Sequence, residues 1–218
     1  MDSEQSNTKR IVLVPGIGLG GCELLVLGWY LKRQGFHAQI FWRNPWRRSL
    51  QDSAELLHRF LQRYQDETVH LVGHSLGGLV VLQTLQDYPT TPVGKIVTLG
   101  TPHCGCLAAR RVLKAPGGRG LLGEALVSAC HETILPIPPG CAVGAIAGSL
   151  NMLLGFLLCP QNANDTLVCV NETQHPDLTA HCILPVSHSG MVMSHKVSIM
   201  IARFLHTESF SSEKTEKQ

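Results

Sequence analysis

A serine set between glycines is the residue of this chain whose surroundings best suit it for chemistry. Residues 73–77 read Gly-His-Ser-Leu-Gly, with Ser75 at the centre. An apolar run, Val69–Gly73, precedes the serine, and a segment of helical pattern, Leu76 to about Tyr88, follows it at once. A strand that turns sharply into a helix exposes the hydroxyl at the helix N-terminus, where backbone N–H groups stabilise a developing negative charge. The pattern predicts that Ser75 is a nucleophile for acyl transfer.

The glycines around this serine are expected to be required by the turn. A Cβ atom at Gly73 or Gly77 would collide with the crossing chain. A further glycine, Gly78, would let the helix pack closely on the sheet. A bare Gly-x-Ser-x-Gly occurs by chance in many sequences, so the strand before it, the helix after it and the extra glycine are what distinguish this one.

A second glycine-rich segment, residues 16–21, follows the first apolar run, Arg10–Val14. Such a turn supplies the other oxyanion donor, so we assign the oxyanion hole to the backbone N–H groups of Ile17 and Leu76. The same segment also fits the dinucleotide pattern Gly-x-Gly-x-x-Gly. A dinucleotide site would need an acidic residue at the end of the second strand, and residues 41–44 read Phe-Trp-Arg-Asn. No cofactor is therefore expected.

Short apolar runs alternate with helix-length segments along the chain, which is typical of a parallel sheet covered on both faces. Strands are expected at Arg10–Val14, Ala38–Trp42, Val69–Gly73, Lys95–Leu99, Cys141–Ala147 and Cys182–Val186. Helices are expected at Cys22–Gln34, Ser49–Tyr64, Leu76–Tyr88, Cys106–Lys114, Leu121–His131 and Ser189–His206. We expect a single domain over 10–206, with a short cap inserted at about 102–140 and disordered tails at 1–9 and 207–218.

Three motifs give the sequence a family resemblance: Pro15-Gly16, the segment Gly73–Gly78, and Gly100–His103, which reads Gly-Thr-Pro-His. Together they resemble lipases and esterases of the α/β-hydrolase fold, above all small bacterial members, over residues 10–206. Pro15 stands where a histidine is commoner. The resemblance implies an α/β fold with a mostly parallel central sheet, helices on both faces and a short cap. It also implies a catalytic triad in the order serine, acid, histidine.

His188 is the expected base of this triad, because it follows the last strand on a loop at the edge of the sheet where Ser75 lies. The alternatives are His175, His181 and His195. For the acid, the similar enzymes carry an aspartate just before a small apolar turn, which Asp165 matches. Asp177 is the second candidate, and Glu172 is the remaining downstream carboxylate considered.

A hydrophobic substrate is expected because leucines gather between the fourth strand and the acid. An apolar channel would be lined by Leu121, Leu122, Leu126, Leu153, Leu154, Phe156 and Leu157, with Met191 and Met193 beside the base. The leading function is therefore a carboxylic-ester hydrolase, either an esterase or a small lipase. A thioesterase or amidase would use the same triad, and a catalytically silent scaffold on this fold is the alternative from another class.

Composition excludes several other classes of protein. The 218 residues carry a net charge of +2 and no run of Lys or Arg, so no nucleic-acid partner is expected. The polar opening MDSEQSNTKR lacks the apolar segment of a secretory signal, which favours a cytoplasmic protein. In that compartment the eight cysteines are expected to be free, six of them small buried thiols: Cys22, Cys130, Cys141, Cys159, Cys169 and Cys182.

A His/Cys cluster and a long uncharged segment are also considered, as a metal site and as a membrane span. The cluster His103-Cys104-Gly105-Cys106 lacks a second ligand pair at zinc-binding spacing, so no metal is expected. Residues 141–158 contain no charge, but glycines and polar residues interrupt them. A buried strand followed by a turn fits this segment better than a membrane span. Transient contact with a membrane or lipid surface is left open. The oligomeric state is left open.

Overall fold

A sheet of parallel strands forms the centre of the molecule. The computed structural model describes residues 9–17, 20–42, 48–118, 127, 134–152 and 163–211. The strands lie in the order β2-β1-β3-β4-β5-β6, and every neighbouring pair is parallel. Their bounds are β1 Arg10–Val14, β2 His37–Ile40, β3 Val69–His74, β4 Val93–Leu99, β5 Val143–Gly148 and β6 Ala180–Leu184. The expected α/β architecture is confirmed.

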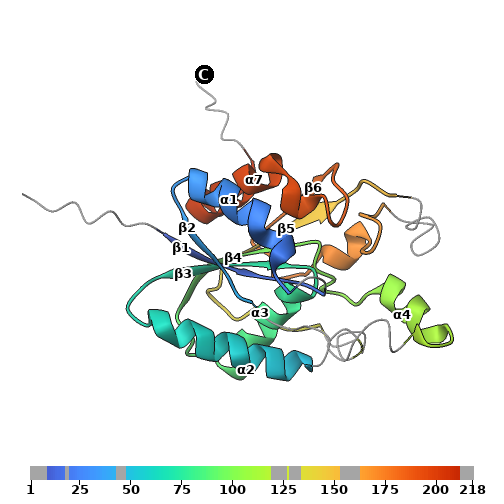
Figure 1. The fold of residues 1–218 in the computed structure, drawn as a ribbon, viewed down its shortest axis with the longest axis horizontal. Coiled ribbons are helices and arrows are strands. Elements are labelled where there is room, and N and C mark those ends of the chain that lie inside the picture. Colours follow the sequence, from blue (N-terminus) through green and yellow to red (C-terminus); the bar gives the residue numbers. More distant parts are fainter. Residues whose placement is uncertain are drawn as a thin grey trace, which may run out of the picture.

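Helices cover both faces of this sheet (Figure 1). The α-helices are α1 Leu25–Arg33, α2 Leu50–Leu61, α3 Leu76–Asp87, α4 Leu107–Lys114 and α7 His195–Thr207. In the described part of the chain, short 3₁₀ turns accompany them at η1 Cys22–Leu24, η2 Gln62–Tyr64, η3 Val170–Thr173 and η4 Met191–Met193. Helices α1 and α7 lie on one face, and α2 and α3 lie on the other (Figure 1). This arrangement is the doubly covered sheet that the alternating apolar runs predict.

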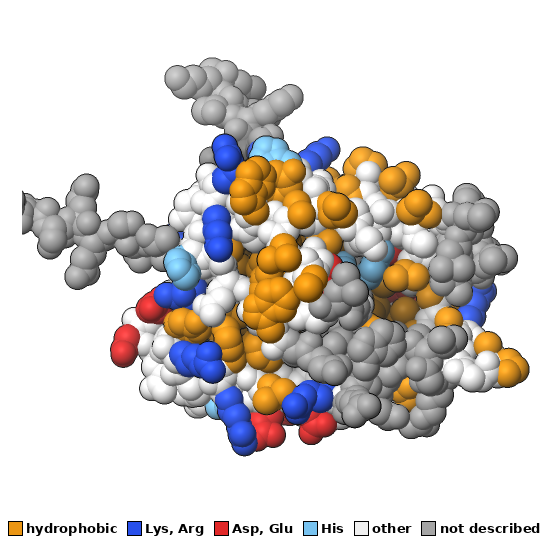
Figure 2. Space-filling view, in the orientation of Figure 1, with side chains coloured by type: hydrophobic (Ala, Val, Ile, Leu, Met, Phe, Trp, Pro, Cys, Tyr) orange, Lys and Arg blue, Asp and Glu red, His pale blue; other side chains and the backbone are white. Residues whose placement is uncertain are grey.

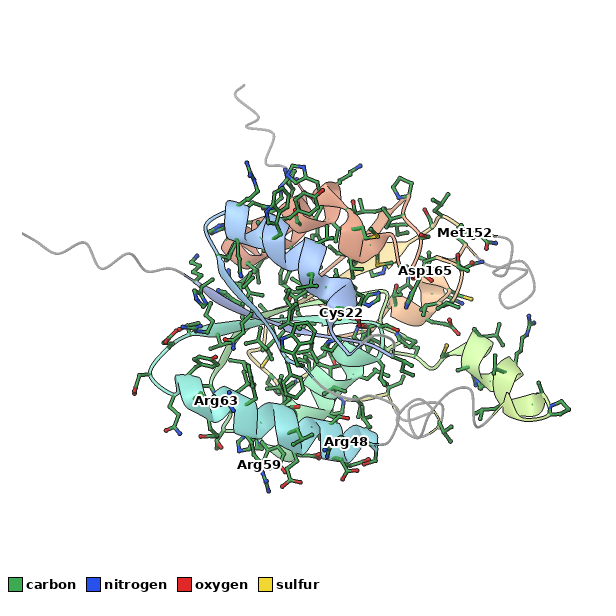
Figure 3. All side chains as sticks on the ribbon, in the orientation of Figure 1. Cys22, Arg48, Arg59, Arg63, Met152 and Asp165 are labelled. Atoms are coloured by element: carbon green, nitrogen blue, oxygen red, sulfur yellow. The ribbon has the colours of Figure 1, made fainter. Side chains whose placement is uncertain are left out.

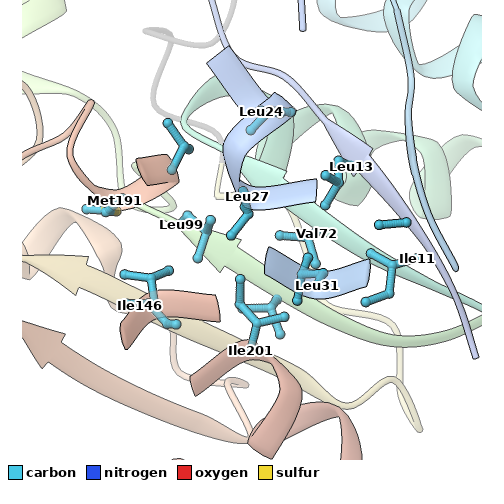
Figure 4. Packing of buried hydrophobic residues seen from close by; sticks show 14 of the residues in the cluster. Ile11, Leu13, Leu24, Leu27, Leu31, Val72, Leu99, Ile146, Met191 and Ile201 are labelled. Carbon is cyan, nitrogen blue, oxygen red and sulfur yellow. The ribbon is translucent and has the colours of Figure 1, made fainter. Parts of the chain in front are cut away.

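Each face of the sheet buries its own apolar cluster. On the first face, side chains of α1 and α7 such as Leu27, Leu31 and Ile201 pack on β-strand residues such as Val72 and Ile146 (Figure 4). On the second face, a comparable cluster joins α2 and α3 to the sheet. All six residues of β3 are buried, which explains why this strand reads as an apolar run without alternation.

Local signals explain where several elements start and stop. Ser49 caps α2 in a reciprocal capping box, because its hydroxyl accepts from the Asp52 N–H while the Asp52 carboxylate accepts from the Ser49 N–H. The predicted extension of this helix to Tyr64 is a 3₁₀ turn. The last strand ends at Leu184 instead of Val186, because Pro185 has no N–H to continue the ladder.

The closing helix begins six residues later than expected. Instead of starting at Ser189, α7 starts at His195, and the Ser194 hydroxyl caps it by accepting from the Val197 N–H. A 3₁₀ turn, η4, precedes it. The expected helix Leu121–His131 lies outside the described residues except for Val127.

The uncharged segment 141–158 contains β5, which is a fully buried strand between β4 and β6. Residues 153–158 lie outside the described part of the chain. Within the described ranges, no helix combines the length and the apolarity that crossing a bilayer would require. The interpretation of this segment as a buried strand is confirmed for residues 143–148.

The expectation that six cysteines are buried is wrong at Cys22, which is exposed at the start of η1. Cys141 and Cys182 are half-buried, and Cys169 is buried. Cys130 and Cys159 lie outside the described residues.

Candidate active site

The order of the strands places the candidate site at the carboxyl ends of β1 and β3. The chain runs from β1 to β2 on one side and then crosses to β3 on the other side of β1. At such a reversal the loops after the two central strands diverge and leave room for a ligand. Ser75 follows β3, and the glycine-rich segment 16–21 follows β1.

Ser75 occupies a strained backbone conformation between β3 and α3. Its φ of 55° and ψ of −126° are rare for a residue with a side chain. Its N–H donates to the Leu99 carbonyl at 2.8 Å, and its carbonyl accepts from the Thr101 hydroxyl at 2.9 Å. The side chain is half-exposed, so this turn presents a hydroxyl to solvent at the start of a helix.

The glycines of the turn are required by contacts with backbone. A Cβ atom on Gly73 would lie 2.5 Å from the Gly78 Cα atom, and one on Gly77 would lie 2.1 Å from the Val14 carbonyl oxygen. The prediction that these two glycines are sterically required is confirmed. Gly78 has a related role, because a Cβ atom there would lie 2.2 Å from the Thr101 hydroxyl.

Replacing Gly77 by alanine is expected to lower the free energy of unfolding by about 3 kcal/mol or more, because its new methyl group meets the backbone at the end of β1. Gly35→Ala is the matched control. Gly35 has a φ of +87° but no atom within 4 Å of an added Cβ, so its cost should be about 1 kcal/mol. Urea unfolding of both variants measures the difference. Equal losses would mean that α3 and β1 are not packed as described.

The loop after β1 lies directly against the nucleophile. A Cβ atom on Gly16 would be 2.9 Å from Ser75 Cβ and 3.5 Å from Ser75 Oγ. The next residue, Ile17, is half-buried, and Leu76 is the first residue of α3. The first N–H groups of a helix have no partner within it. Ile17 and Leu76, the two predicted oxyanion donors, therefore belong to the two segments that flank the hydroxyl.

Asp165 and His188 form a buried pair. His188 Nδ1 lies 2.7 Å from Asp165 Oδ2, and the His188 N–H donates to the Asp165 carbonyl at 2.8 Å. Asp165 is 0% exposed and His188 is 6% exposed. Because a carboxylate accepts the bond, the network assigns the proton to Nδ1 and leaves Nε2 available as an acceptor. Both residues predicted for the triad downstream of the serine are thus in contact.

The loop around Asp165 fixes the orientation of its carboxylate. Asp165 Oδ1 accepts from the Leu167 N–H at 3.0 Å and from the Val168 N–H at 2.8 Å, which leaves Oδ2 for His188. Between them, Thr166 has a φ of 103°, which a β-branched residue rarely adopts. Thr166 is held by its N–H bond to Asn164 Oδ1 at 2.9 Å. This loop maintains a strained turn beside the acid, as functional sites often do.

His74 links the turn at Ser75 to the loop of His188, and sequence reasoning missed this role. Its Nε2–H donates to the His188 carbonyl at 3.1 Å, and the two imidazole rings lie 4.9 Å apart. Burial lowers the pKa of His74 to about 3, so the ring stays neutral near pH 7. Since His74 immediately precedes Ser75, this contact brings the base loop to the nucleophile.

Two glycines without an assigned role also make room for the pair. A Cβ atom on Gly100 would lie 2.8 Å from Asp165 Oδ2 and 3.1 Å from His188 Nδ1. A Cβ atom on Gly148 would lie 2.7 Å from Asp165 Cβ and from the Met191 methyl carbon. Met191 is 0% exposed in the core, so its predicted place in an apolar channel is wrong. Met193 is 62% exposed.

The rejected candidates for the base and the acid have other partners. His195 stands at the start of α7 with its ring 5.0 Å from that of Tyr30. His181 Nε2 lies 2.8 Å from the Thr173 hydroxyl, and His175 Nδ1 accepts from the Asp177 N–H at 3.1 Å. The Glu172 carboxylate accepts from the Cys169 N–H and the Leu107 N–H, so it holds the start of α4.

The residues predicted to line an apolar channel lie outside the described part of the chain: Leu121, Leu122, Leu126, Leu153, Leu154, Phe156 and Leu157.

The buried histidines predict that the protein loses stability in acid. Burial lowers the pKa of His103, like that of His74, to about 3, and His103 Nε2 lies 3.0 Å from the Thr98 hydroxyl. Unfolding restores a pKa of about 6.5, so the unfolded chain binds more protons below that pH. As the pH falls from 6.5 towards 3, His74 and His103 should each reduce the free energy of unfolding by up to about 1.4 kcal/mol per pH unit.

Urea unfolding at a series of pH values between 8 and 5 measures this slope. His103→Gln should lower the slope of the unfolding free energy against pH by up to about 1.4 kcal/mol per pH unit, the contribution of one proton. His195→Gln, at an exposed position, should leave this slope unchanged. A flat profile for the unmodified protein would mean that these two imidazoles are not buried in the neutral form.

The all-parallel sheet with helices on both faces has the architecture of the α/β-hydrolase fold, and a family match in the sequence agrees with it. Residues 42–115 match the family described as the α/β hydrolase fold. No curated protein matches the chain.

Solved structures share the fold at low sequence identity. The mature lipase BlEst2 of Bacillus licheniformis is 18% identical with a TM-score of 0.75, over 93% of this chain and 92% of that one. The metagenomic carboxyl esterase MGS0156 is 18% identical with a TM-score of 0.67, over 92% and 76%. Phospholipase PlaB of Legionella pneumophila, in its complex with thio-NAD, is 14% identical with a TM-score of 0.78, over 93% of this chain and 59% of that one. The chain therefore has the α/β-hydrolase fold, and its expected resemblance to lipases and esterases of this fold is confirmed.

Proposed function

We propose that this protein is a serine hydrolase that cleaves carboxylic esters through Ser75, His188 and Asp165. The observation that carries the proposal is the 2.7 Å contact between His188 Nδ1 and Asp165 Oδ2, on a loop that His74 ties to the strained turn of Ser75. A buried aspartate that orients a histidine toward a half-exposed serine hydroxyl is the arrangement that activates a serine nucleophile. The lipase and esterase neighbours support the ester as the substrate class.

The reaction follows from the roles of these groups. His188 Nε2 takes the proton of the Ser75 hydroxyl as Oγ attacks the ester carbonyl, and Asp165 stabilises the imidazolium that forms. The N–H groups of Ile17 and Leu76 stabilise the oxyanion of the tetrahedral intermediate. His188 then protonates the departing alcohol, which leaves an acyl group on Ser75. Water attacks this acyl-enzyme with His188 as base, and the acid is released.

Apolar side chains around the acid support a hydrophobic acyl group. Leu150 and Met152 follow β5 at the same edge of the sheet and are 51% and 58% exposed. The Met152 N–H donates to the Thr166 hydroxyl at 3.0 Å, which holds this segment beside Asp165 (Figure 3). An acyl chain leaving the serine in this direction would cover apolar surface that is otherwise exposed to water.

A substrate panel on the purified protein tests the proposal. We expect p-nitrophenyl octanoate to be cleaved with a higher kcat/KM than p-nitrophenyl acetate, and both faster than octanoyl-CoA or an octanoyl anilide. A higher kcat/KM for the thioester or the amide than for the esters would mean that the protein is a thioesterase or an amidase instead. Failure to cleave any member, together with failure of a fluorophosphonate to label the protein, would favour the silent scaffold.

A further inference from the structure

The outer face of α1 is apolar where an exposed helix face is usually polar. Leu25, Val26 and Trp29 are 53%, 37% and 52% exposed, and Trp42 after β2 is 56% exposed. Trp42 lies near the start of α1, because its ring would be 3.1 Å from a Cβ atom on Gly21. Figure 2 shows hydrophobic side chains gathered over α1 on this face of the molecule. Contiguous exposed apolar surface of this kind marks an interaction site.

The helices of this face are also uniformly basic. Helices α1 and α7 contain Lys32, Arg33, Lys196 and Arg203 and no Asp or Glu. Helices α2 and α3 on the other face carry both signs of charge, with Asp52, Glu55 and Asp87 beside the basic Arg59. Among the residues that the structure describes, no carboxylate pairs with Lys32, Arg33 or Lys196. The apolar face of α1 is thus accompanied by cations that are free to meet an anionic surface.

A groove between α1 and α7 combines the two properties. It has a volume of about 510 Å³ and is lined by Trp29, Tyr30, Arg33, Gln34 and His195. The Arg33 guanidinium lies 5.0 Å from the centre of the Trp29 ring, and the His195 ring lies 5.0 Å from that of Tyr30. Aromatic rings beside cationic donors suit the boundary between lipid headgroups and acyl chains.

This face adjoins the candidate active site. Helix α1 follows η1 and the glycine-rich loop that contacts Ser75, and it packs against η4, which begins three residues after His188. Met193 of η4 is exposed, so the segment that follows the base also presents an apolar side chain to solvent.

We propose that the outer face of α1, with the groove against α7, docks the protein on an anionic phospholipid bilayer. Leu25, Val26 and Trp29 enter the headgroup boundary, while Lys32, Arg33 and Lys196 contact lipid phosphates. The basic charge of both helices selects an anionic bilayer as the occupant over a second copy of this chain, whose corresponding face would be equally basic. The docking is independent of the proposed hydrolysis, because it uses none of the triad residues.

Sedimentation with lipid vesicles tests the proposal. The Ser75→Ala variant is used throughout so that no lipid is consumed. Vesicles contain phosphatidylcholine alone or mixed with phosphatidylglycerol. We expect preferential binding to the mixed vesicles that weakens as salt is added. Trp29→Ala should lower the partition coefficient about tenfold, and Arg33→Gln should lower it about fivefold on the mixed vesicles only.

Matched variants on the other face of the sheet serve as controls. The apolar control is Ile183 of β6, which is 51% exposed, and the basic control is Arg59 of α2. Because both lie away from the proposed docking face, Ile183→Ala and Arg59→Gln should bind vesicles like the parent protein. Thermal unfolding shows that each variant is folded. Absence of binding, or equal losses for the α1 variants and the controls, would overturn the proposal. A concentration-dependent dimer that Trp29→Ala abolishes, without vesicle binding, would assign the face to a second copy and overturn it as well.

Discussion

Ser75→Ala is expected to lower kcat/KM for the preferred ester by at least about 10⁴-fold, because no other group can form the acyl-enzyme. The backbone of residue 75 should keep its strained turn, since its N–H and carbonyl bonds to Leu99 and Thr101 do not involve the hydroxyl. The loss should therefore occur without unfolding. Initial rates with a p-nitrophenyl ester, together with circular dichroism, measure both quantities.

Ser149→Ala is the matched control for this substitution. Ser149 follows β5 at the same edge of the sheet, and its hydroxyl donates to the Leu184 carbonyl at 3.3 Å. Removal of this hydroxyl should leave the rate within about twofold. A folded Ser75→Ala variant that retains more than about a hundredth of the parent rate would assign the nucleophile to another residue.

His188→Ala is expected to lower kcat/KM by about 10³-fold or more, because the variant lacks the base that removes the serine proton. Truncation also leaves the buried Asp165 carboxylate without its partner, so some loss of stability should accompany the loss of rate. Initial rates at saturating and low ester concentration should show the loss mainly in kcat. Added imidazole should restore part of the rate if it enters the vacated space.

His195→Ala separates the base from a general effect of removing a histidine. His195 begins α7 and contacts Tyr30 rather than Asp165. On soluble esters, the kcat/KM of the His195→Ala variant should stay within about twofold of the parent value. If His195→Ala loses as much activity as His188→Ala, the Asp165–His188 pair is structural and the base has to be sought elsewhere.

The turn at Ser75 could be predicted from the sequence because its causes are local. A buried strand, glycines that backbone contacts require and a helix start all lie within Val69–Gly78. The structure also places the predicted acid and base, Asp165 and His188, within hydrogen-bonding distance. Position after the last strand pointed to His188, and the resemblance to lipases and esterases pointed to Asp165.

Other features of the site depend on contacts between segments far apart in the chain. Nothing in the residues around His74 predicts its bond to the His188 carbonyl, which joins positions 114 residues apart. The burial of Met191 follows from the late start of α7. Both Ser189 and Ser194 can cap a helix, and only the structure shows that Ser194 does so. With the helix begun at His195, Met191 packs beneath the Asp–His pair and Met193 faces solvent.

Mapping the adduct of a fluorophosphonate probe tests the central claim most directly, because the probe reacts preferentially with a serine that a neighbouring base has activated. The unmodified protein is labelled, digested and analysed by peptide mass spectrometry. A single adduct on Ser75, much reduced in the His188→Ala variant, is the result that we predict. A folded protein in which Ser75 stays unlabelled, or one in which a different residue carries the adduct, would contradict the proposed mechanism.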